Sequence, residues 1–382
     1  METYKLSDLC EILDSKRKPL SALQRAKKQG IYPYYGAQGI IDHLDEYLLD
    51  GEYLLVAEDG ANLETRNQPI ANIAKGKIWV NNHAHVLGNN GKCPLNLLGF
   101  ILNNMNISPY VTGCAQPKLN QENLRNIEIE LPSHIDRIAS ILFSLDRKIE
   151  LNNKINADLE EMAQAIFKNW FVDFEPFKDG KFVDSELGMI PEGWKVGTLT
   201  EIASYMNGLA MQKFPSENNE DSLPVLKIKE LGQGFCGTDS DRCSCNIKDE
   251  CKIHNGDVIF SWSGTLLVDV WCGGDCGLNQ HLFKVTSKDY PKWFYYYWTK
   301  HHLQEFIHIA KDKAVTMGHI KRGHLEEAMV AIPDNDSMEK AHELFEPILS
   351  KMISLRLENS RLSLLRDTLL PRLMSGKLEV PQ

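Results

Sequence analysis

The sequence has no apolar run that approaches the roughly 20 residues needed to cross a bilayer. Its first residues, METYKLSDLCEILDSKRK, lack the apolar core that follows a basic start in secretory signal peptides. Nine cysteines are an odd number for a disulfide framework, and they favour reduced thiols. Together these absences predict a soluble protein of the cytoplasm.

One group of cysteines is a candidate zinc site. Cys236, Cys243, Cys245 and Cys251 lie near His254 in the sequence. The chain has no CxxC pair, although such close pairs are usual among the ligands of structural zinc. Scattered loop and core thiols are therefore the favoured interpretation, and the sequence leaves zinc binding by this cluster open.

The common signatures of catalysis are also missing. The chain has no GxxxxGK[ST] phosphate loop, no GxGxxG that opens a helix, no HExxH and no GxSxG. The Asn-Pro-Pro-aromatic motif of amino-methyltransferases is absent too. His83 and His85 alternate on one strand and share a face, as a metal pair would, but histidines hydrogen-bonded at a domain surface are favoured. The sequence therefore predicts no catalytic, cofactor or metal site on this chain.

The charge is unevenly distributed along the chain. The formal net charge of −10 argues against a uniformly basic nucleic-acid-binding protein. Residues 16–29 nevertheless hold six basic residues and no acidic one, and residues 311–324 hold four basic residues, one acid and two histidines. A single such segment is typical of a solvated loop. Two of them, at comparable places in the two halves, point to a shared binding role.

The chain repeats itself with a period near 200 residues. Five blocks recur in the same order, and their spacing drifts by up to about a dozen residues, as loops do. Each copy combines short strands with one helix, which predicts a mixed α/β module. The matched blocks are GIYPYYGAQGIID at 30 and SLPVLKIKELGQGF at 222, GEYLLVAEDG at 51 and GDVIFSWSGT at 256, NNHAHVL at 81 and LNQHLFKV at 278, CPLNLLGFILNN at 93 and YPKWFYYYWTKH at 290, and LRNIEIELPS at 124 and LEEAMVAIPD at 325.

A long helix is predicted after each copy. Apolar residues at a 3,4 spacing run through residues 135–170 and again through 338–373, which is the pattern of a coiled-coil seam. Asn152 and Asn156 interrupt the first seam, and Asn359 interrupts the second at the same place as Asn156. A buried asparagine at such a position fixes the register at a cost in stability.

The expected fold class is α+β, with two similar mixed α/β globular modules and an internal pseudo-two-fold repeat. The modules are joined by the two long helices, which we expect to form an antiparallel coiled coil, because a whole module must fit between the end of one and the start of the next. The helix pair would act as a spacer between the modules.

Several segments resemble the specificity (S) subunit of type I restriction–modification enzymes. IFKNWFVDFEPF at 166, GMIPEGWKVGTL at 188 and LRDTLLPRLMSGKLEV at 365 look like the boundary segments that follow the long helices in that family. YPYYGAQGIID at 32 and MGHIKRGHLEEAMVAIP at 317 look like elements of its recognition modules. The resemblance covers essentially the whole chain and rests on several segments in a fixed order.

The resemblance implies a non-catalytic subunit that selects the DNA sequence for a type I complex. Residues 1–132 would be the first target recognition domain, and 171–333 a boundary segment with the second. Residues 133–170 would be the first conserved spacer helix, and 334–382 the second with the C-terminal boundary segment. Each recognition domain would read one half of a bipartite duplex. Because side chains at the matched loops differ, we expect the two halves to differ in sequence.

The resemblance also implies the partners of the chain. The helices would dock methyltransferase subunits, with two such subunits for each chain, and restriction subunits would complete the enzyme. S-adenosylmethionine, ATP and Mg²⁺ are then expected on these partners and not on this chain.

Candidate DNA contacts are polar residues in basic loops or loops at strand ends. Lysine, arginine and tyrosine suit phosphates, and glutamine or asparagine can pair with adenine. Tyr34 and Tyr35 face opposite sides of a strand, so one core face cannot bury both. The sequence does not separate phosphate contacts from base contacts. The candidates are Lys16, Arg17, Lys18, Tyr34, Tyr35, Gln38, Asn62, Arg66, His83, Gln116, Lys118, Lys227, Lys229, Ser263, Thr265, His281, Lys313, His319, Lys321 and Arg322.

Two other functions stay open from the residues alone. The repeat also suits a scaffold whose two modules bind proteins, and a nuclease with an unrecognised site is the other alternative. The run WFYYYW at 293 is compatible with a platform for stacked bases, but its match to LNLLGF in the first copy favours a buried helix. The basic loops in both copies and the boundary segments favour DNA recognition.

Overall fold

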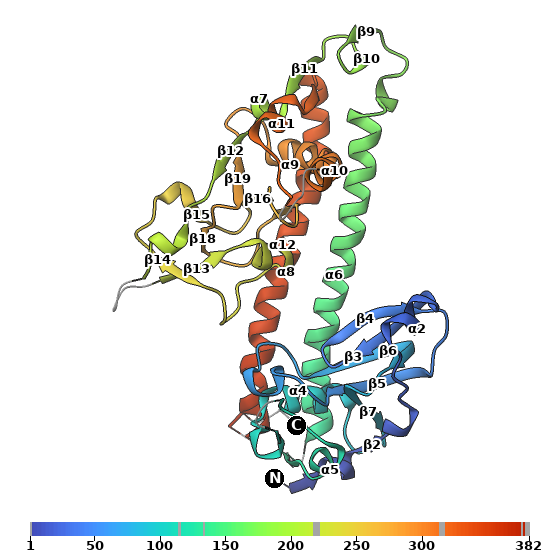
Figure 1. Ribbon diagram of the computed structural model, residues 1–382. Helices are drawn as coiled ribbons and strands as arrows, with labels where there is room; N and C mark the ends of the chain where they lie inside the picture. Colours follow the sequence, from blue (N-terminus) through green and yellow to red (C-terminus); the bar gives the residue numbers. More distant parts are fainter. Residues whose placement is uncertain are drawn as a thin grey trace. The chain divides into compact units, whose positions relative to one another are not determined.

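The computed structural model divides into two compact units by its internal contacts (Figure 1). Unit 1 consists of Met1–Lys148 and Leu362–Gln382, and unit 2 of Ile149–Arg361. Every helix in the described part of the chain is too short or too polar to cross a membrane. The structure describes residues 2–113, 116–132, 134–216, 222–312, 318–375 and 377–378.

Unit 1 is built around a six-stranded sheet (Figure 1). The strands of unit 1 are β1 (Glu2–Lys5), β2 (Cys10–Ile12), β3 (Gln29–Gly36), β4 (Gly39–Leu44), β5 (Leu49–Ala57), β6 (Ala71–Val80), β7 (Ala84–Asn89) and β8 (Glu128–Leu131). The order in the sheet is β2-β7-β5-β6-β3-β4, and β1 pairs separately with β8. Strands β3 and β6 run parallel, with Tyr34 opposite Trp79 and Tyr35 opposite Val80. This parallel pair brings the end of β3 beside the end of β6.

Mostly short helices pack around this sheet. They are α1 (Leu6–Leu9), α2 (Ala22–Ala26), α3 (Asn62–Thr65), α4 (Leu95–Asn104) and α5 (Gln121–Arg125), with 3-10 turns η1 (Asp14–Lys16) and η2 (Ser108–Tyr110). Helix α4 packs on β5 and β6, and it buries Leu98 and Leu102 in the core of the unit. Gly99 permits this approach, because a Cβ at that position would lie 2.9 Å from a methyl group of Leu54.

Unit 2 contains two four-stranded sheets and two strand pairs. Its strands are β9 (Phe182–Ser185), β10 (Gly188–Pro191), β11 (Lys195–Thr198), β12 (Ser204–Asn207), β13 (Ser222–Leu226), β14 (Arg242–Ser244), β15 (Lys252–Ile253), β16 (Val258–Ser261), β17 (Leu267–Val270), β18 (Cys276–Leu278), β19 (Leu282–Thr286) and β20 (Met329–Ile332). The sheets have the orders β12-β19-β16-β17 and β14-β13-β18-β15, and the pairs are β9–β10 and β11–β20. Strands β13 and β18 run parallel, with Val225 opposite Gly277.

An aromatic core joins the helices of unit 2. These are α7 (Leu199–Ile202), α8 (Ile228–Gln233), α9 (Lys292–His301), α10 (Leu303–Asp312) and α11 (Arg322–Glu327), with 3-10 turns η3 (Glu175–Phe177), η4 (Met211–Lys213) and η5 (Asp249–Cys251). Helix α9 holds the WFYYYW run, and all six of its side chains are buried. Trp293 stacks on Phe345 with ring centres 4.6 Å apart, and Trp298 meets Phe167 edge to face at 5.1 Å. The run is therefore a buried helix, as its repeat partner predicted, and no platform for bases.

The two long helices are α6 (Ile135–Phe171) and α12 (Asn335–Met374). In unit 2, Phe167 packs on Phe345 while Asn152 contacts Asn359, so the helices run antiparallel there. In unit 1, the apolar core includes Leu142 of α6 and Leu373 of α12. Each unit thus contains its own segment of the predicted seam.

The asparagines that interrupt the seam form a polar contact between the helices. Asn152 is fully buried, and its Nδ2 donates to Asn359 Oδ1 at 2.9 Å and to Glu358 Oε2 at 2.8 Å. Asn359 Nδ2 donates back to Asn153 Oδ1 at 2.8 Å. These hydrogen bonds therefore fix the register of the two helices, because a shift of either helix separates the donors from their acceptors.

The two units repeat one chain path. Unit 1 pairs its first strand with its last, β1 with β8, and unit 2 pairs the strand that follows the β9–β10 hairpin with its last, β11 with β20. Both units place a ten-residue helix after a proline, α4 and α9. The parallel pair of β3 and β6 recurs as that of β13 and β18. Two mixed modules and two long antiparallel helices confirm the predicted fold class. The division into segments 1–132, 133–170, 171–333 and 334–382 stays a prediction.

Candidate nucleic-acid interface

A tight turn joins β6 to β7 in unit 1, and Asn81 holds it. The Asn81 side chain is buried, and its Oδ1 accepts the backbone N–H of His83 at 2.7 Å. The Asn81 N–H donates to the Tyr35 carbonyl at 3.0 Å, and the Glu58 N–H donates to the His83 carbonyl at 2.9 Å. The turn is therefore tied to the end of β3 on one side and to the end of β5 on the other.

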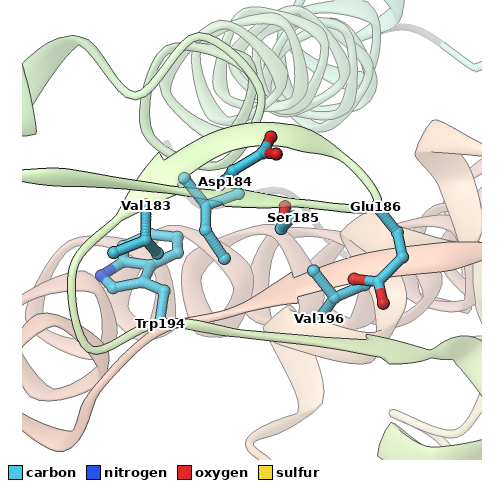
Figure 2. Close-up of a pocket in the computed structure, with 7 residues that line it drawn as sticks. Val183, Asp184, Ser185, Glu186, Trp194 and Val196 are labelled. Atoms are coloured by element: carbon cyan, nitrogen blue, oxygen red, sulfur yellow. The ribbon is translucent and has the colours of Figure 1, made fainter.

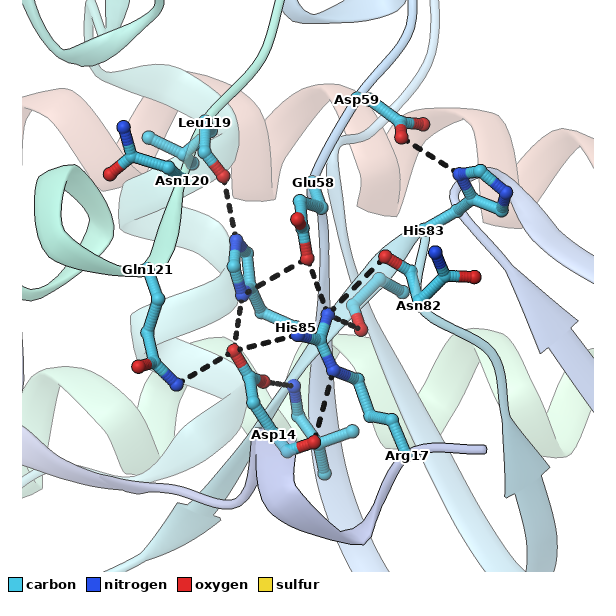
Figure 3. A network of polar contacts seen from close by, with 12 residues as sticks. Asp14, Arg17, Glu58, Asp59, Asn82, His83, His85, Leu119, Asn120 and Gln121 are labelled. Carbon is cyan, nitrogen blue, oxygen red and sulfur yellow. Dashed lines mark hydrogen bonds and ion pairs between the residues drawn. The ribbon is translucent and has the colours of Figure 1, made fainter. Parts of the chain in front are cut away.

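The side chain of His83 stands at the surface of this turn, with 48% of it exposed. Its Nδ1 lies 2.7 Å from Asp59 Oδ2 (Figure 3). Asp59 is paired with Lys118 through an isolated β-bridge, and Lys118 Nζ lies 3.1 Å from Glu58 Oε1. Residues from three separate parts of the chain thus meet at one polar surface.

The predicted basic segment runs beside the same turn. The Lys18 N–H donates to the Val80 carbonyl at 3.1 Å, and its ammonium group lies 5.9 Å from the centre of the Trp79 ring. Tyr35 ends β3 next to Asn81, as the hydrogen bond above shows. Among the candidates of unit 1, Tyr35 is partly buried. The exposed ones are Lys16, Lys18, Gln38, His83, Gln116 and Lys118.

A buried polar network lies beneath the turn (Figure 3). His85 is fully buried, and its Nδ1 lies 2.6 Å from Asp14 Oδ2. Gln121 donates to the same carboxylate at 3.0 Å. Arg17 bridges Asp14 at 3.3 Å and Glu58 at 2.5 Å. The exposed turn therefore rests on internally neutralised charges, and His85 is part of this support, not a partner of His83 in a metal pair.

The two carboxylates of this network are held in their charged form. Burial alone would raise the pKa of Asp14, but the hydrogen bond and charge of His85, the Val86 N–H and Arg17 outweigh it, and the pKa is lowered. Burial also opposes ionisation of Glu58, yet Arg17, His85 and Lys118 lower its pKa below the usual value. Arg17 and Lys118 are in turn neutralised in part by the protein itself.

Unit 2 builds the same turn between β18 and β19. Asn279 is buried, its Oδ1 accepts the His281 N–H at 3.2 Å, and its own N–H donates to the Leu226 carbonyl at 3.1 Å. The Trp262 N–H donates to the His281 carbonyl at 3.4 Å. Ser263 Oγ lies 3.1 Å from His281 Nδ1. Every backbone contact of the Asn81 turn thus has a counterpart here.

The side chains around the two turns differ, although the backbone is the same. An isolated β-bridge pairs Ser263 with His319, just as one pairs Asp59 with Lys118. Unit 1 therefore presents aspartate, histidine and lysine where unit 2 presents serine, histidine and histidine. This shared frame with different side chains is what two readers of different targets require.

Two candidates in the basic and tyrosine-rich segments need correction. The Tyr34 ring is buried, with 1% exposed, and its hydroxyl accepts the Leu20 N–H at 2.9 Å. Arg17 is bound by Asp14 and Glu58 and also donates to the Ala84 carbonyl at 3.0 Å. Tyr34 serves the core and Arg17 the buried network, so neither is free to reach a duplex.

Three further candidates have structural roles. Asn62 is buried and exchanges hydrogen bonds with the Gln68 backbone at 2.9 and 3.0 Å. Arg66, at φ 54°, ends α3 and donates from Nη2 to the Leu102 carbonyl at 2.8 Å, which satisfies the last turn of α4. Ser263 is 3% exposed and acts through His281. We therefore withdraw all three as direct contacts.

The remaining candidates lie in unit 2 and keep their status as predictions. Lys227 is paired with Asp241, and Lys229 Nζ lies 2.6 Å from Asp239, so both lysines are partly neutralised. Lys313 lies outside the described residues. The exposed candidates of unit 2 are Thr265, His319, Lys321 and Arg322.

Sequence reasoning missed Asp59, Asn81 and Asn279 as parts of the site. The repeated Asn-x-His of residues 81–83 and 279–281 was the signal for the two asparagines, since a polar residue kept at one place in both copies points to a fixed backbone. Asp59 carried no such signal, because its counterpart is a serine and its partner His83 is far away in sequence.

A cavity at the β9–β10 hairpin is separate from the predicted contacts, and two cysteines of the candidate zinc group are buried in an apolar cluster. A cavity of about 510 Å³ under the β9–β10 hairpin is lined by none of the predicted contacts; it is lined by Val183, Asp184, Ser185, Glu186, Ile190, Trp194 and Val196 (Figure 2). Cys243 and Cys251 are buried in one apolar cluster with Met211. Within the described residues, no three histidine, cysteine or carboxylate side chains converge as metal ligands.

Comparison with known proteins gives a match to one family model and matches to several curated relatives. A family model described as the type I restriction modification DNA specificity domain matches residues 1–161 and 191–359. The type I restriction enzyme MjaIX specificity subunit of Methanocaldococcus jannaschii is 31% identical over 71% of this chain, a match that spans 65% of that relative, just under two thirds. The type I restriction enzyme HindI specificity subunit of Haemophilus influenzae is 21% identical over 69% of this chain and 71% of its own.

One solved structure shares the fold of the whole chain. The crystal structure of a type I restriction–modification system S subunit from M. genitalium has a TM-score of 0.53 at 14% sequence identity. The alignment covers 100% of this chain and 96% of that one. At this identity the likeness concerns the fold.

Proposed function

Because the chain belongs to the family of the type I restriction modification DNA specificity domain, we propose that it is the non-catalytic subunit that selects the DNA sequence in a type I restriction–modification complex. The observation that carries this proposal is the repeated turn. Asn81 and Asn279 hold the same backbone in both units, and the surrounding polar side chains differ. A protein that reads two unequal half-sites needs two such surfaces.

Each module is proposed to read one half of a bipartite, asymmetric duplex. Histidine, lysine, glutamine and tyrosine side chains of these surfaces suit phosphate oxygens and base edges. Carboxylates of the protein pair with four of the basic candidates, Arg17, Lys118, Lys227 and Lys229. DNA binding therefore depends on the local charge of each surface rather than on the net charge of −10 of the whole chain. Salt should weaken binding, since phosphate contacts release counterions.

The long helices are proposed to dock methyltransferase subunits, two for each chain. Large apolar side chains stand exposed on both helices, and burial against a partner would remove them from water. These exposed side chains are Ile141, Leu151, Met162, Leu344, Leu364 and Leu365. Restriction subunits would complete the complex, and S-adenosylmethionine, ATP and Mg²⁺ would bind the partner subunits.

The test is a selection from random duplexes by this chain co-purified with its methyltransferase partner, at near-physiological salt. We expect a motif of two short unequal halves with a fixed gap. Salt-sensitive binding without an enriched motif would leave general DNA affinity and remove the specificity function. No binding at all, with the partner present, would favour a protein-binding scaffold.

A further inference from the structure

The structure separates the candidate contacts into a shared and a differing set. His83 and His281 occupy the same point of the same turn, each with its N–H bound by a buried asparagine and its carbonyl bound by the end of a strand. Their neighbours differ in every case. Asp59 corresponds to Ser263, and Lys118 to His319. After the parallel strand, unit 1 continues into the β3–β4 turn with Gln38, whereas unit 2 continues into α8 with Lys229.

Two modules that read different half-sites have one ligand in common, the phosphodiester backbone. Phosphate contacts position a protein, and base contacts carry the sequence information. Resting on the proposed function, we infer that His83 and His281 are equivalent phosphate anchors that place each module on its half-site. The bases are then read by the residues that differ between the units.

The partners of the two imidazoles give the anchors different charges. The Asp59 carboxylate only accepts hydrogen bonds, so it holds a proton on His83 Nδ1. His83 must therefore carry a second proton to donate from Nε2 to a phosphate oxygen, and it binds as an imidazolium. The Ser263 hydroxyl can donate to His281 Nδ1, so a neutral His281 can carry its proton on Nε2. Gln280 Nε2 lies 3.4 Å from His281 Nε2, and a phosphate that accepts the Nε2–H must displace this amide.

The surroundings of His83 suit a cationic anchor. Its side chain is 48% exposed, and Asp59, 2.7 Å away, stabilises the positive charge. Lys118, across the β-bridge, lies 3.1 Å from Glu58, and Arg17 is also bound to Glu58, so the nearest cations are balanced by a carboxylate. An incoming phosphate thus meets His83 without strong competition from unpaired charges of the protein.

The experiment measures affinity, salt dependence and the selected motif for His83→Ala and His281→Ala in complex with the methyltransferase partner. Loss of a hydrogen bond to a charged group should weaken binding to every duplex about tenfold in both variants. The selected motif should stay unchanged. The slope of log K against log salt should fall by up to about 0.9 for His83→Ala, because one cationic contact is lost, and should stay unchanged for His281→Ala.

A matched contrast comes from Gln38→Ala, at a position where the units differ. This variant should relax the base preference in one half-site and leave the other half intact. An unchanged motif with Gln38→Ala would contradict the division between shared and differing residues.

The anchors would be overturned if either histidine variant changed a base preference or left the affinity unchanged. Melting temperatures show whether the alanine variants fold. If an alanine variant does not fold, His83→Gln or His281→Gln replaces it, because glutamine keeps a hydrogen-bond donor. A near-native affinity with the native motif then supports the phosphate anchors, and an altered motif opposes them. A wild-type complex that recovers no motif contradicts the proposed function instead, so the two failures are distinct.

Discussion

At the residue scale, buried polar side chains position the exposed ones. Asn81 and Asn279 are each buried inside a turn and hydrogen-bonded to the backbone of the histidine two residues on. A buried polar group stabilises one geometry when it is paired and costs free energy when it is not. The asparagines therefore determine where His83 and His281 stand.

Asn81→Ala should lower the free energy of unfolding by about 1–2 kcal/mol, because the His83 N–H loses its acceptor and the turn loses the hydrogen bond that holds it. Urea unfolding of the chain measures this loss. Asn82→Ala is the matched control, since that side chain is exposed in the same turn. Equal effects of the two substitutions would contradict a special role of Asn81.

The buried network of Asp14 and Glu58 predicts acid sensitivity. Their pKa values are lowered in the folded protein, so their stabilisation is present above the unfolded values of about 4 and is lost as pH falls through the folded values. Asp14→Asn leaves His85 and Arg17 without the shared carboxylate, which should cost about 3 kcal/mol at pH 7.

The cost of Asp14→Asn should shrink as the pH falls below the unfolded value of about 4 and the wild-type carboxyl group becomes protonated. Urea unfolding of both proteins across this range measures the difference. A difference that is independent of pH would show that charge on Asp14 contributes nothing.

At the element scale, sequence reasoning succeeded where a pattern is long and local. The seams of α6 and α12 and the buried α9 follow from apolar spacing and from the repeat. It failed where the partner is distant in sequence. Arg17 is part of a basic run, yet Glu58, 41 residues on, forms a partly buried ion pair with it.

The end of β3 shows the same limit. Strand alternation separates Tyr34 from Tyr35, but only the parallel pairing with β6 and the hydroxyl contact to Leu20 determine that Tyr34 is the buried one. Neither feature has a local signature in the sequence. About half of the site in unit 1 was predictable as polar loops, whereas its convergence on Asn81 required the fold.

The polar contact between α6 and α12 yields a prediction about pairing. Asn152→Leu alone should lower the free energy of unfolding by about 1–2 kcal/mol, because Asn359 Oδ1 loses its donor inside the seam. Asn152→Leu combined with Asn359→Leu should recover this loss or more, because the seam becomes apolar. Denaturant unfolding measures the coupling. Strictly additive losses would argue that the two asparagines do not act together.

At the scale of the whole molecule, function depends on two modules that share a frame and differ in side chains. In the proposed function, the repeat allows one chain with a net charge of −10 to present two surfaces that read DNA. Its carboxylates neutralise several of the basic residues near the turns, so each surface offers few free cations. Specificity then comes mainly from polar contacts and less from bulk charge.

The long helices are proposed to set the gap between the half-sites. Deleting one matched heptad from α6 and one from α12 removes about 10 Å of each helix. The preferred gap should then shorten by about three base pairs, at about 3.4 Å each, or binding should be lost. Selection from duplexes with varied gaps measures this. An unchanged gap preference would show that the helices do not set the spacing.

The most direct test of the central claim is whether each unit reads its own half-site. Discrimination between the selected duplex and duplexes with one half scrambled should be measured for Lys118→Ala in unit 1 and His319→Ala in unit 2, each in complex with the methyltransferase partner. We expect each substitution to reduce discrimination at one half only, and the two substitutions to affect different halves. Equal loss at both halves, or loss at the same half, would contradict this claim.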